Sequence, residues 1–528
     1  MAAADADGPR RPWWEPAVLY QIYPRSFQDS DGDGVGDLRG ITSRLDYLAW
    51  LGIDALWLSP IFRSPMRDFG YDISDYRDVD PVFGTLEDLD ELIAQAHARG
   101  LRVLLDYVPN HTSSDHPWFV DSRSSRGNPK RDWYVWRDPA PDGGPPNDWR
   151  AVFGGGEWSA WELDPRTGQY YLHLFLPEQP DLNWANPDVR REMHDVLRFW
   201  FRRGVDGFRI DVINLLSKDP ELRDEEPNPA WRPGDRPTDR FLWHRRSDGP
   251  QMPAILAGLR AVAEEFGDRL LVGETYMPLE RLVAYYGGEL PGIHLPFNFQ
   301  LILLPWDARA IGDWIARYEA ALPVGAWPNW VLGNHDQPRV ASRVGPAQAR
   351  VAAMLLLTLR GTPTLFAGDE IGRENVPIPP ERVVDVDGRD PERAPMPWSA
   401  GPGGGFTTGE PWLPLGDAEG VNVEAQRDDP RSMLTLHRRL LAMRRAEPAL
   451  AVGSWIPGPG DDAVLSYGRE AEGRRLEVAL NLGHQPRSVE LVPGRWRVAL
   501  STHLDRGGEV LEGRADLRAD EGVILEPA

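Results

Sequence analysis

The chain has 528 residues, of which 41% are hydrophobic and 26% are charged, a composition typical of globular proteins. This length exceeds a single compact core, so we expect one large domain with one or two smaller ones. The formal net charge of -23 leaves no basic excess to neutralise phosphates, which argues against a nucleic-acid partner. The absence of cysteine excludes disulfides and thiolate chemistry.

The N-terminal residues 1–14 contain an arginine pair but no apolar run behind it, so we do not interpret them as an export signal. The longest apolar stretch, residues 351–359, is too short to span a bilayer. We therefore expect a cytoplasmic protein that binds no membrane. The oligomeric state is left open.

The first predicted strand, residues 18–27, runs into an acidic loop at residues 29–37 (Asp-Ser-Asp-Gly-Asp-Gly-Val-Gly-Asp). Acidic residues separated by glycine can turn several carboxylates toward one hard cation, Ca²⁺ or Mg²⁺. Gly40 stands where an EF-hand needs a bidentate Glu, so that motif is excluded. The alternative is a solvated acidic turn without an ion. The candidate ligands are Asp29, Asp31, Asp33, Asp37 and the carbonyl oxygen of Val35.

The next segments alternate strand and helix, as in a parallel sheet. A second strand at 53–59 precedes a loop with Asp68 and Tyr71, and a helix at 86–99 precedes a third strand at 102–107. From residue 110 to about residue 175 this alternation disappears, and Pro, Gly and Trp dominate instead. We predict a small domain inserted after the third strand.

The fourth strand, residues 205–212, follows a helix that begins at Asn186-Pro187, a capping residue and a proline in the first turn. Arg209 and Asp211 are two residues apart, so on a strand their side chains leave the same face. Taken by themselves, Arg209 and Asp211 could be an interior ion pair that only fixes the strand register. However, polar clusters also end three other strands, and the carboxyl ends of parallel barrel strands carry the chemistry of that fold.

Four further strands at 269–274, 293–297, 330–334 and 363–367 complete a (β/α)₈ TIM barrel. Beyond Pro448, short alternating strands separated by Gly and Pro turns predict a C-terminal antiparallel β-sandwich domain. The predicted domains are the barrel (1–109 and 176–447), the inserted domain (110–175) and the β domain (448–528).

Four strand ends carry a specific resemblance, and they read Asp-Tyr-Val-Pro-Asn-His at 106–111, Gly-Phe-Arg-Ile-Asp-Val at 207–212, Gly-Glu-Thr at 273–275 and Asn-His-Asp at 334–336. Together they resemble the α-amylase family of glycoside hydrolases, and within it the bacterial α-glucosidase and oligo-1,6-glucosidase group. The similarity covers nearly the whole chain. It also implies that the acidic loop is a structural calcium site.

The resemblance implies a role for each matching side chain. Asp211 corresponds to the nucleophile, Glu274 to the general acid and base, and Asp336 to the residue that stabilises the transition state. The innermost sugar would be held by Asp68, Tyr71, His111, Arg209 and His335, while Arg389 matches an arginine near the leaving sugar.

A retaining glycosidase needs two carboxyl groups about 5 to 5.5 Å apart, one ionised to attack and one protonated to assist the leaving oxygen. Arg209 is expected to keep Asp211 ionised, whereas Glu274 needs a raised pKa to begin as an acid.

The chain departs from the group after the eighth strand, with Gly-Asp-Glu at 368–370 for Gly-Glu-Glu and Pro-Met-Pro-Trp at 395–398 for Pro-Met-Gln-Trp. Val212 and the Gln-Pro-Asp-Leu-Asn run at 179–183 are associated in this group with α-1,6 bonds, although Val212 could also be barrel packing. We expect a retaining, exo-acting α-glucosidase of short oligosaccharides that favours α-1,6 bonds. The alternatives are a sucrose isomerase or transglucosylase, a trehalose- or maltose-preferring α-glucosidase, and a noncatalytic binding relative.

Overall fold

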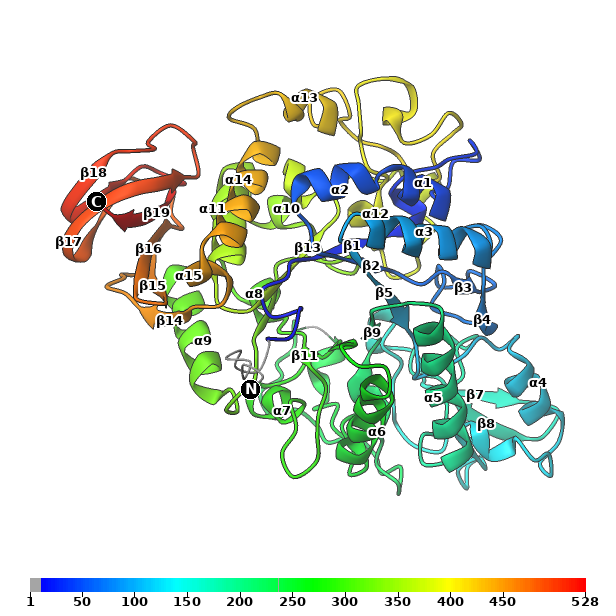
Figure 1. Ribbon diagram of the computed structural model, residues 1–528. Coiled ribbons are helices and arrows are strands. Elements are labelled where there is room, and N and C mark those ends of the chain that lie inside the picture. Colours follow the sequence, from blue (N-terminus) through cyan, green and yellow to red (C-terminus); the bar gives the residue numbers. More distant parts are fainter. Residues whose placement is uncertain (1–10, 236) are drawn as a thin grey trace, which may run out of the picture.

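A computed structural model describes residues 11–235 and 237–528 (Figure 1). The first ten residues, on which the interpretation of the N-terminal segment rests in part, lie outside the described residues. Among the described residues, no helix combines the length and the apolar character that a membrane span requires.

Eight parallel strands form a nearly closed barrel, which confirms the predicted fold class. Each strand pairs with the next in the order β11-β10-β9-β5-β2-β1-β13-β12. In the described part of the chain, the barrel is left open at one place, between β11 and β12, which stand at the two ends of this order and are not hydrogen-bonded to each other. The strands are β1 (Leu19–Ile22), β2 (Ala55–Leu58), β5 (Arg102–Tyr107), β9 (Gly207–Ile210), β10 (Leu270–Gly273), β11 (Leu295–Pro296), β12 (Asn329–Val331) and β13 (Thr362–Phe366).

Helices surround this barrel (Figure 1). The helix predicted before the fourth strand is α5 (Pro187–Arg202), where the side chain of Asn186 accepts a hydrogen bond from the backbone N–H of Asp188. Gly204, at φ +103°, then turns the chain into β9. The others around the barrel are α1 (Leu38–Ser43), α2 (Leu45–Leu51), α3 (Leu86–Ala98), α6 (Met252–Glu264), α7 (Leu279–Ala284), α8 (Gln300–Leu303), α9 (Ala308–Ala321), α10 (Val340–Val344), α11 (Pro346–Thr358) and α14 (Met433–Ala446).

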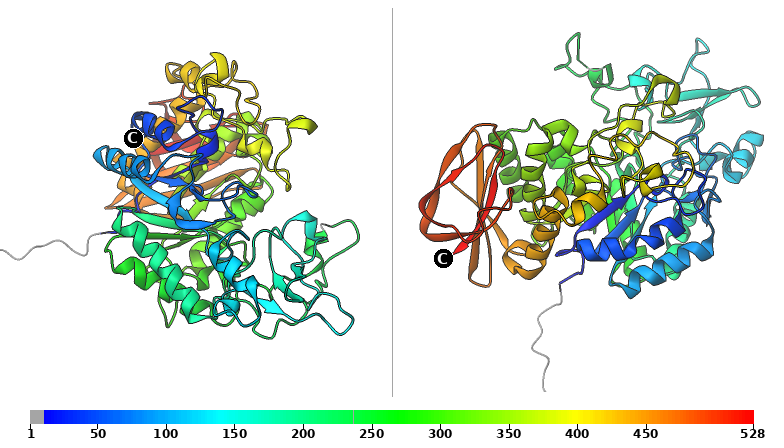
Figure 2. Two further views of the ribbon diagram at one scale, coloured as in Figure 1. Left: turned by 90° about the vertical axis from the view of Figure 1, so that its right-hand side faces the viewer. Right: turned by 90° about the horizontal axis from the view of Figure 1, so that it is seen from above.

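The segment between β5 and α5 forms a small unit beside the barrel (Figure 2). It holds α4 (Pro117–Ser124) and an antiparallel sheet in the order β6-β8-β7, where β6 is Trp136–Arg137, β7 is Trp161–Asp164 and β8 is Gln169–Leu172. Its own apolar core includes Trp149, Phe153, Trp161 and Phe175. A short antiparallel pair, β3 (Phe62–Arg63) and β4 (Asp75–Val79), precedes it.

The C-terminal segment is antiparallel, as predicted, and lies at the other end of the molecule (Figure 2). Its six strands join one hydrogen-bonded sheet in the order β14-β15-β16-β19-β17-β18. Strand β17 contains register shifts between Glu490 and Arg495 and between Val498 and Leu500, where the ladder is interrupted. A second small core forms there around Trp496 and Val498. The strands are β14 (Ser454–Pro457), β15 (Val464–Ala471), β16 (Arg474–Asn481), β17 (Arg487–Ser501), β18 (Val510–Leu517) and β19 (Gly522–Pro527).

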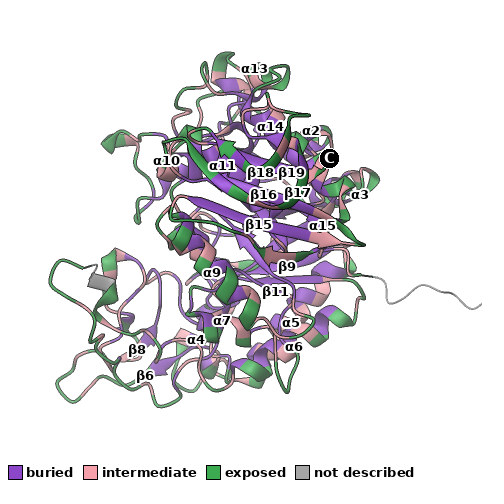
Figure 3. Cartoon of the chain, turned by 90° about the vertical axis from the view of Figure 1, so that its left-hand side faces the viewer, coloured by how far each residue is buried: buried purple, intermediate pink, exposed green. Residues whose placement is uncertain are grey.

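The barrel strands are buried apart from Arg102, the first residue of β5, whereas the loops of the inserted segment are largely exposed (Figure 3). The long connection after β13 contains two short helices, α12 (Asp390–Arg393) and α13 (Val423–Arg427). A third short helix, α15 (Pro448–Ala451), follows α14. The inserted segment and this connection both reach the carboxyl ends of the strands, where they enclose a pocket.

Candidate active site

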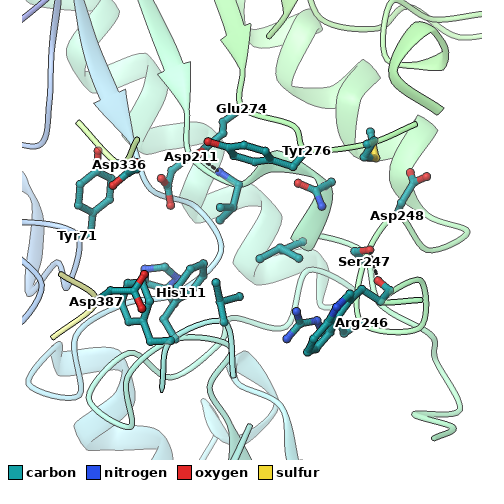
Figure 4. Close-up of a pocket in the computed structure, with 18 of the residues that line it drawn as sticks. Tyr71, His111, Asp211, Arg246, Ser247, Asp248, Glu274, Tyr276, Asp336 and Asp387 are labelled. Atoms are coloured by element: carbon teal, nitrogen blue, oxygen red, sulfur yellow. Dashed lines mark hydrogen bonds between the residues drawn. The ribbon is translucent and has the colours of Figure 1, made fainter. Parts of the chain in front are cut away.

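A pocket of about 670 Å³ opens at the carboxyl ends of the barrel strands. Asp211 and Glu274 lie next to each other on one side of it, with Asp336 and Tyr71 beside them, and Arg246, Ser247 and Asp248 lie at the far end (Figure 4). The lining side chains that the sequence predicted are Asp68, Tyr71, His111, Asp211, Val212, Glu274, Asp336 and Arg389.

Arg209 holds three carboxylates together beneath the pocket. Its Nη1 donates to both oxygens of Asp106, at 2.8 and 3.0 Å, and to Oδ1 of Asp211 at 2.8 Å. Its Nη2 donates to Oε2 of Glu274. The guanidinium is 1% exposed, and its carbon lies 5.1 Å from the ring centre of Trp57. Asp211 and Glu274 are therefore fixed side by side on one cation.

The charge state of these carboxylates differs from the sequence expectation. Burial raises the pKa of Asp211 well above its usual value, although Arg209 opposes the shift, and neighbouring Glu274 raises it further. Burial also raises the pKa of Asp106 to about 6. Asp106 and Asp211 thus share one guanidinium with a third buried carboxylate, and their mutual repulsion favours the protonated forms of Asp106 and Asp211. The arginine alone does not keep Asp211 ionised in the substrate-free protein.

Asp336 follows β12 and faces two arginines from the connection after β13. Its Oδ1 accepts from Nη1 of Arg389 at 3.1 Å and from Nη2 of Arg393 at 2.8 Å. Burial alone would raise the pKa of Asp336, but His335 and these guanidinium groups hold it below its usual range. Asp336 is therefore an anion across the working pH range.

His335 is buried and has hydrogen-bond partners on both ring nitrogens. Nδ1 lies 2.7 Å from Nε2 of Gln21, which can only donate, so Nδ1 is the acceptor. Nε2 then carries the proton and lies 2.7 Å from the hydroxyl of Tyr71, which in turn donates to Asp106. Burial holds the pKa of His335 well below its usual value. A neutral histidine stacked on Tyr71 thus orients that ring toward the pocket.

An ion pair lies at the inner end of the pocket, away from Arg246. Oδ1 of Asp68 accepts from Nη2 of Arg389 at 2.8 Å, and Oδ2 accepts from Nε2 of Gln179 at 3.0 Å. The guanidinium of Arg389 also stacks on Phe153 of the inserted segment, 4.7 Å from the ring centre. The resemblance placed Arg389 near the leaving sugar, and the structure places it against Asp68 and Asp336.

His111 lines the same end, 5.0 Å from the ring of Phe175. Burial lowers the pKa of His111, so it is neutral.

Val212 is not part of the strand, since β9 ends at Ile210. Its φ of +35° is a left-handed conformation that β-branched residues rarely adopt. The backbone N–H of Val212 donates to Oε2 of Glu274 at 3.0 Å. Strand alternation therefore does not apply here, and the side chain lines the same pocket as Asp211.

The acidic loop gathers three of its four predicted carboxylates. Single oxygens of Asp29, Asp31 and Asp37 all lie within 4.8 Å of one another. Asp33 is outside this group, and its Oδ1 accepts from the backbone N–H of Val35. Burial would raise the pKa of Asp29, but hydrogen bonds from Thr407 and the loop backbone lower it, so it is ionised. This donor set fits a hard cation.

The sequence reasoning missed Gln21, Asp385 and Arg393, and it quoted Asp106 and Gln179 without a role. Asp385 accepts two hydrogen bonds from the guanidinium of Arg389, and Arg393 donates to the backbone oxygen of His335. Asp106 begins the motif at residues 106–111 and lies near the end of β5, so its place in the site could have been predicted from the sequence. Gln21 and Asp385 lie more than 300 residues apart, and neither stands in a motif.

The family model described as alpha amylase, catalytic domain, matches residues 21–453. The chain belongs to the α-amylase family of glycoside hydrolases. A second model, described as a domain of unknown function, matches residues 459–518. Asp211, Glu274 and Asp336 are all present in one pocket, and this together with the family match sets the noncatalytic alternative aside.

Curated relatives of this α-amylase family member span most of its length. It is 46% identical over 92% of both chains to a probable alpha-glucosidase of Rhizobium meliloti (strain 1021). It is 37% identical to an oligo-1,6-glucosidase of Heyndrickxia coagulans, over 94% of this chain and 97% of that one.

Solved structures give the same fold. The structure of an alpha-glucosyl transfer enzyme, XgtA, aligns at a TM-score of 0.93 with 41% identity, covering 98% of this chain and all of the other. That of the trehalulose synthase MutB from Pseudomonas mesoacidophila MX-45 aligns at 0.91 with 35% identity and the same coverage.

Proposed function

We propose that this glycoside hydrolase is a retaining, exo-acting α-glucosidase that removes terminal glucose from short oligosaccharides in the cytoplasm. The observation that carries the proposal is the pairing of Asp211 and Glu274 on the single guanidinium of Arg209. Retaining catalysis uses two neighbouring carboxyl groups, because one attacks the anomeric carbon while the other protonates the leaving oxygen.

In this proposal Asp211 forms a covalent glucosyl ester as Glu274 gives its proton to the glycosidic oxygen. Glu274 then takes a proton from the incoming water, and the ester is hydrolysed with the original anomeric configuration. This first step requires Asp211 ionised and the proton on Glu274. Asp336, kept anionic by its surroundings, stabilises the positive charge that develops on the sugar ring.

Exo action is supported by the inner end of the pocket. The buried ion pair between Asp68 and Arg389 joins the loop after β2 to the connection after β13. A sugar chain that continued past the innermost unit would have to separate this pair and leave the buried carboxylate of Asp68 without its cation, which costs about 3 to 5 kcal/mol. A terminal glucose needs no such opening.

A preference for α-1,6 bonds is supported by Val212, whose side chain lines the pocket beside Asp211. A branched apolar side chain narrows the space for the leaving sugar and offers no hydrogen bond. One methyl-scale difference in a pocket is worth about 1 to 3 kcal/mol, enough for selection between linkages. The relative named as an oligo-1,6-glucosidase is consistent with this proposal.

Glucosyl transfer is the second candidate, because the two solved structures above are named as a transfer enzyme and a trehalulose synthase. Both reactions use the same ester intermediate and differ in which acceptor reaches it. The ratio of free glucose to transfer product on sucrose and on isomaltose separates them. Transfer product in excess at low substrate concentration would replace hydrolysis as the main activity.

Glu274→Gln tests the assignment of roles. It should lower kcat strongly on isomaltose but much less on p-nitrophenyl α-glucoside, because a good leaving group needs little protonation. Asp211→Ala should abolish hydrolysis of both substrates. Equal losses for Glu274→Gln on both substrates would contradict its role as the acid.

We also propose that Asp29, Asp31 and Asp37 hold a structural cation, Ca²⁺ or Mg²⁺. Such an ion would neutralise three carboxylates at the entrance of α1, whose first turn is capped by the side chain of Asp37. The bond-cleaving residues lie elsewhere, so catalysis does not pass through this site.

A further inference from the structure

Arg246 differs from the other arginines that line the pocket. Arg389 pairs with Asp68, and Arg281 pairs with Asp248. Arg246 is 7% exposed, yet among the described residues its guanidinium donates only to the backbone oxygen of Arg150. The negative charges of Glu225 and Asp181 act on Arg246, but among the described residues neither carboxylate forms an ion pair with its guanidinium. A buried guanidinium that lacks such a pair and lies beside a cavity points to a ligand.

The surrounding backbone holds Arg246 in place. Its guanidinium carbon lies 3.2 Å from the ring centre of Trp243, and its Nη1 reaches across to the inserted segment at Arg150. Trp243 has a φ of +58°, which bulky residues rarely adopt. Strain of this kind persists where the structure fixes a functional side chain.

Arg246 lies on the side of the pocket that the leaving group must occupy. Figure 4 shows it at the opposite end from Asp336 and Tyr71, with Asp211 and Glu274 between. If glucose occupies the inner end and is cleaved beside Asp211, the group attached to it extends toward Arg246. The apolar walls there are Val152, Leu215, Leu242, Met277 and Pro278.

The chemistry of this chamber matches a neutral sugar. A guanidinium presents several N–H donors in a fixed plane, which suits two hydroxyl oxygens of one ring, and apolar walls suit its C–H faces. A phosphorylated sugar fits less well, because Arg281, which also lines the pocket, is already paired with Asp248, and the walls beside Arg246 are apolar. Burial lowers the pKa of Arg246 to about 9, so it is a cation at neutral pH.

We infer that Arg246 is a specificity-determining residue that binds hydroxyl oxygens of a neutral leaving sugar. The inference rests on the proposed α-glucosidase function and adds to it the residue that selects which leaving sugar is accepted.

The test compares Arg246→Met with Arg245→Met, a matched control on the same loop whose guanidinium pairs with Glu226 and does not line the pocket. Two substrates are used, namely α-glucosyl fluoride, which has no leaving sugar, and isomaltose. Arg246→Met should lower kcat/KM on isomaltose by about tenfold to a hundredfold, the loss expected for hydrogen bonds to a charged group. On α-glucosyl fluoride it should stay within twofold of wild type.

Several outcomes decide the matter. Equal losses on both substrates, or an equal effect of Arg245→Met, would overturn the inference, since Arg246 would then only support the wall. No loss on isomaltose would overturn it as well. Arg246→Lys, which keeps the charge but loses the planar donors, should restore isomaltose hydrolysis only in part.

A disaccharide phosphorylated on its reducing glucose extends the test. Wild type should turn it over at least about tenfold more slowly than the unphosphorylated sugar, and faster turnover would overturn the assignment of a neutral leaving group. Wild type that fails on α-glucosyl fluoride would instead refute the proposed function itself, and the role of Arg246 with it.

Discussion

Replacing Arg209 with lysine should disable the site more than any other conservative change. The guanidinium makes four charge-assisted hydrogen bonds to three buried carboxylates, three through Nη1 and one through Nη2. The single ammonium of lysine cannot reach both sides of this arrangement. A hydrogen bond to a charged group is worth about 1.5 to 3 kcal/mol, so the loss of two of them in Arg209→Lys should lower the free energy of unfolding by about 3 to 6 kcal/mol.

The same change should move the pH profile in a defined direction. Asp211 must be ionised to attack, and the positive charge of Arg209 lowers its pKa against the effect of burial. Lysine keeps the charge but loses most of the hydrogen bonds that stabilise the ionised carboxylates, so the pKa of Asp211 rises further and the acid limb of kcat/KM shifts to higher pH. At pH 6 the loss of two or more such hydrogen bonds should reduce kcat/KM by about a hundredfold or more.

Denaturant unfolding and a kcat/KM profile from pH 4 to 9 measure both effects. Arg102→Lys is the matched control, because Arg102 begins the same barrel's β5, is 39% exposed and pairs with Asp206 far from the pocket. It should change the free energy of unfolding by no more than about 1 kcal/mol and leave the profile in place. An unchanged acid limb in Arg209→Lys would refute the electrostatic reasoning.

Two further predictions concern the pocket wall and the acidic loop. Val212→Thr keeps the branched shape at φ +35° but adds a hydroxyl. The ratio of kcat/KM on maltose to kcat/KM on isomaltose should therefore rise by up to about tenfold. An unchanged ratio would indicate that the loop carrying Arg389 sets the linkage preference instead. Chelation should lower the melting temperature and leave the initial rate at low temperature unchanged, because carboxylates at Asp29, Asp31 and Asp37 repel one another without an ion. Asp29→Asn should melt lower than wild type and not respond to chelator; a wild type that ignores chelator would leave the loop as a solvated turn.

The elements with local signals could be predicted closely. The proline and cap at Asn186 set the start of α5, and apolar spacing carried it to Gly204. The first strand was predicted too long, since Pro24 has no N–H for the ladder and begins a 3₁₀ helix at Pro24–Ser26. Tyr23 and Phe27 are buried although they lie beyond the end of β1, so their apolar character resembled that of a strand.

The side chains at the strand ends were found because parallel strands bring their carboxyl ends together. Their hydrogen-bond partners could not be found from the sequence. Asp336 bonds to Arg393, 57 residues away, and Asp68 bonds to Arg389, 321 residues away, and no local pattern connects either pair. The raised pKa of Asp211 was also not expected from the sequence, because it depends on burial and on how many carboxylates share one guanidinium. Burial of that kind is a property of the packed barrel and has no signature in the neighbouring residues.

Proton NMR of the sugar released in the first seconds of hydrolysis tests the central claim most directly. If Asp211 attacks and Glu274 protonates the leaving oxygen, isomaltose or p-nitrophenyl α-glucoside must release glucose first as the α anomer, before mutarotation mixes the two forms. Release of the β anomer first would mean inversion by a single displacement. That result would contradict the assignment of Asp211 and Glu274 as a nucleophile and acid pair.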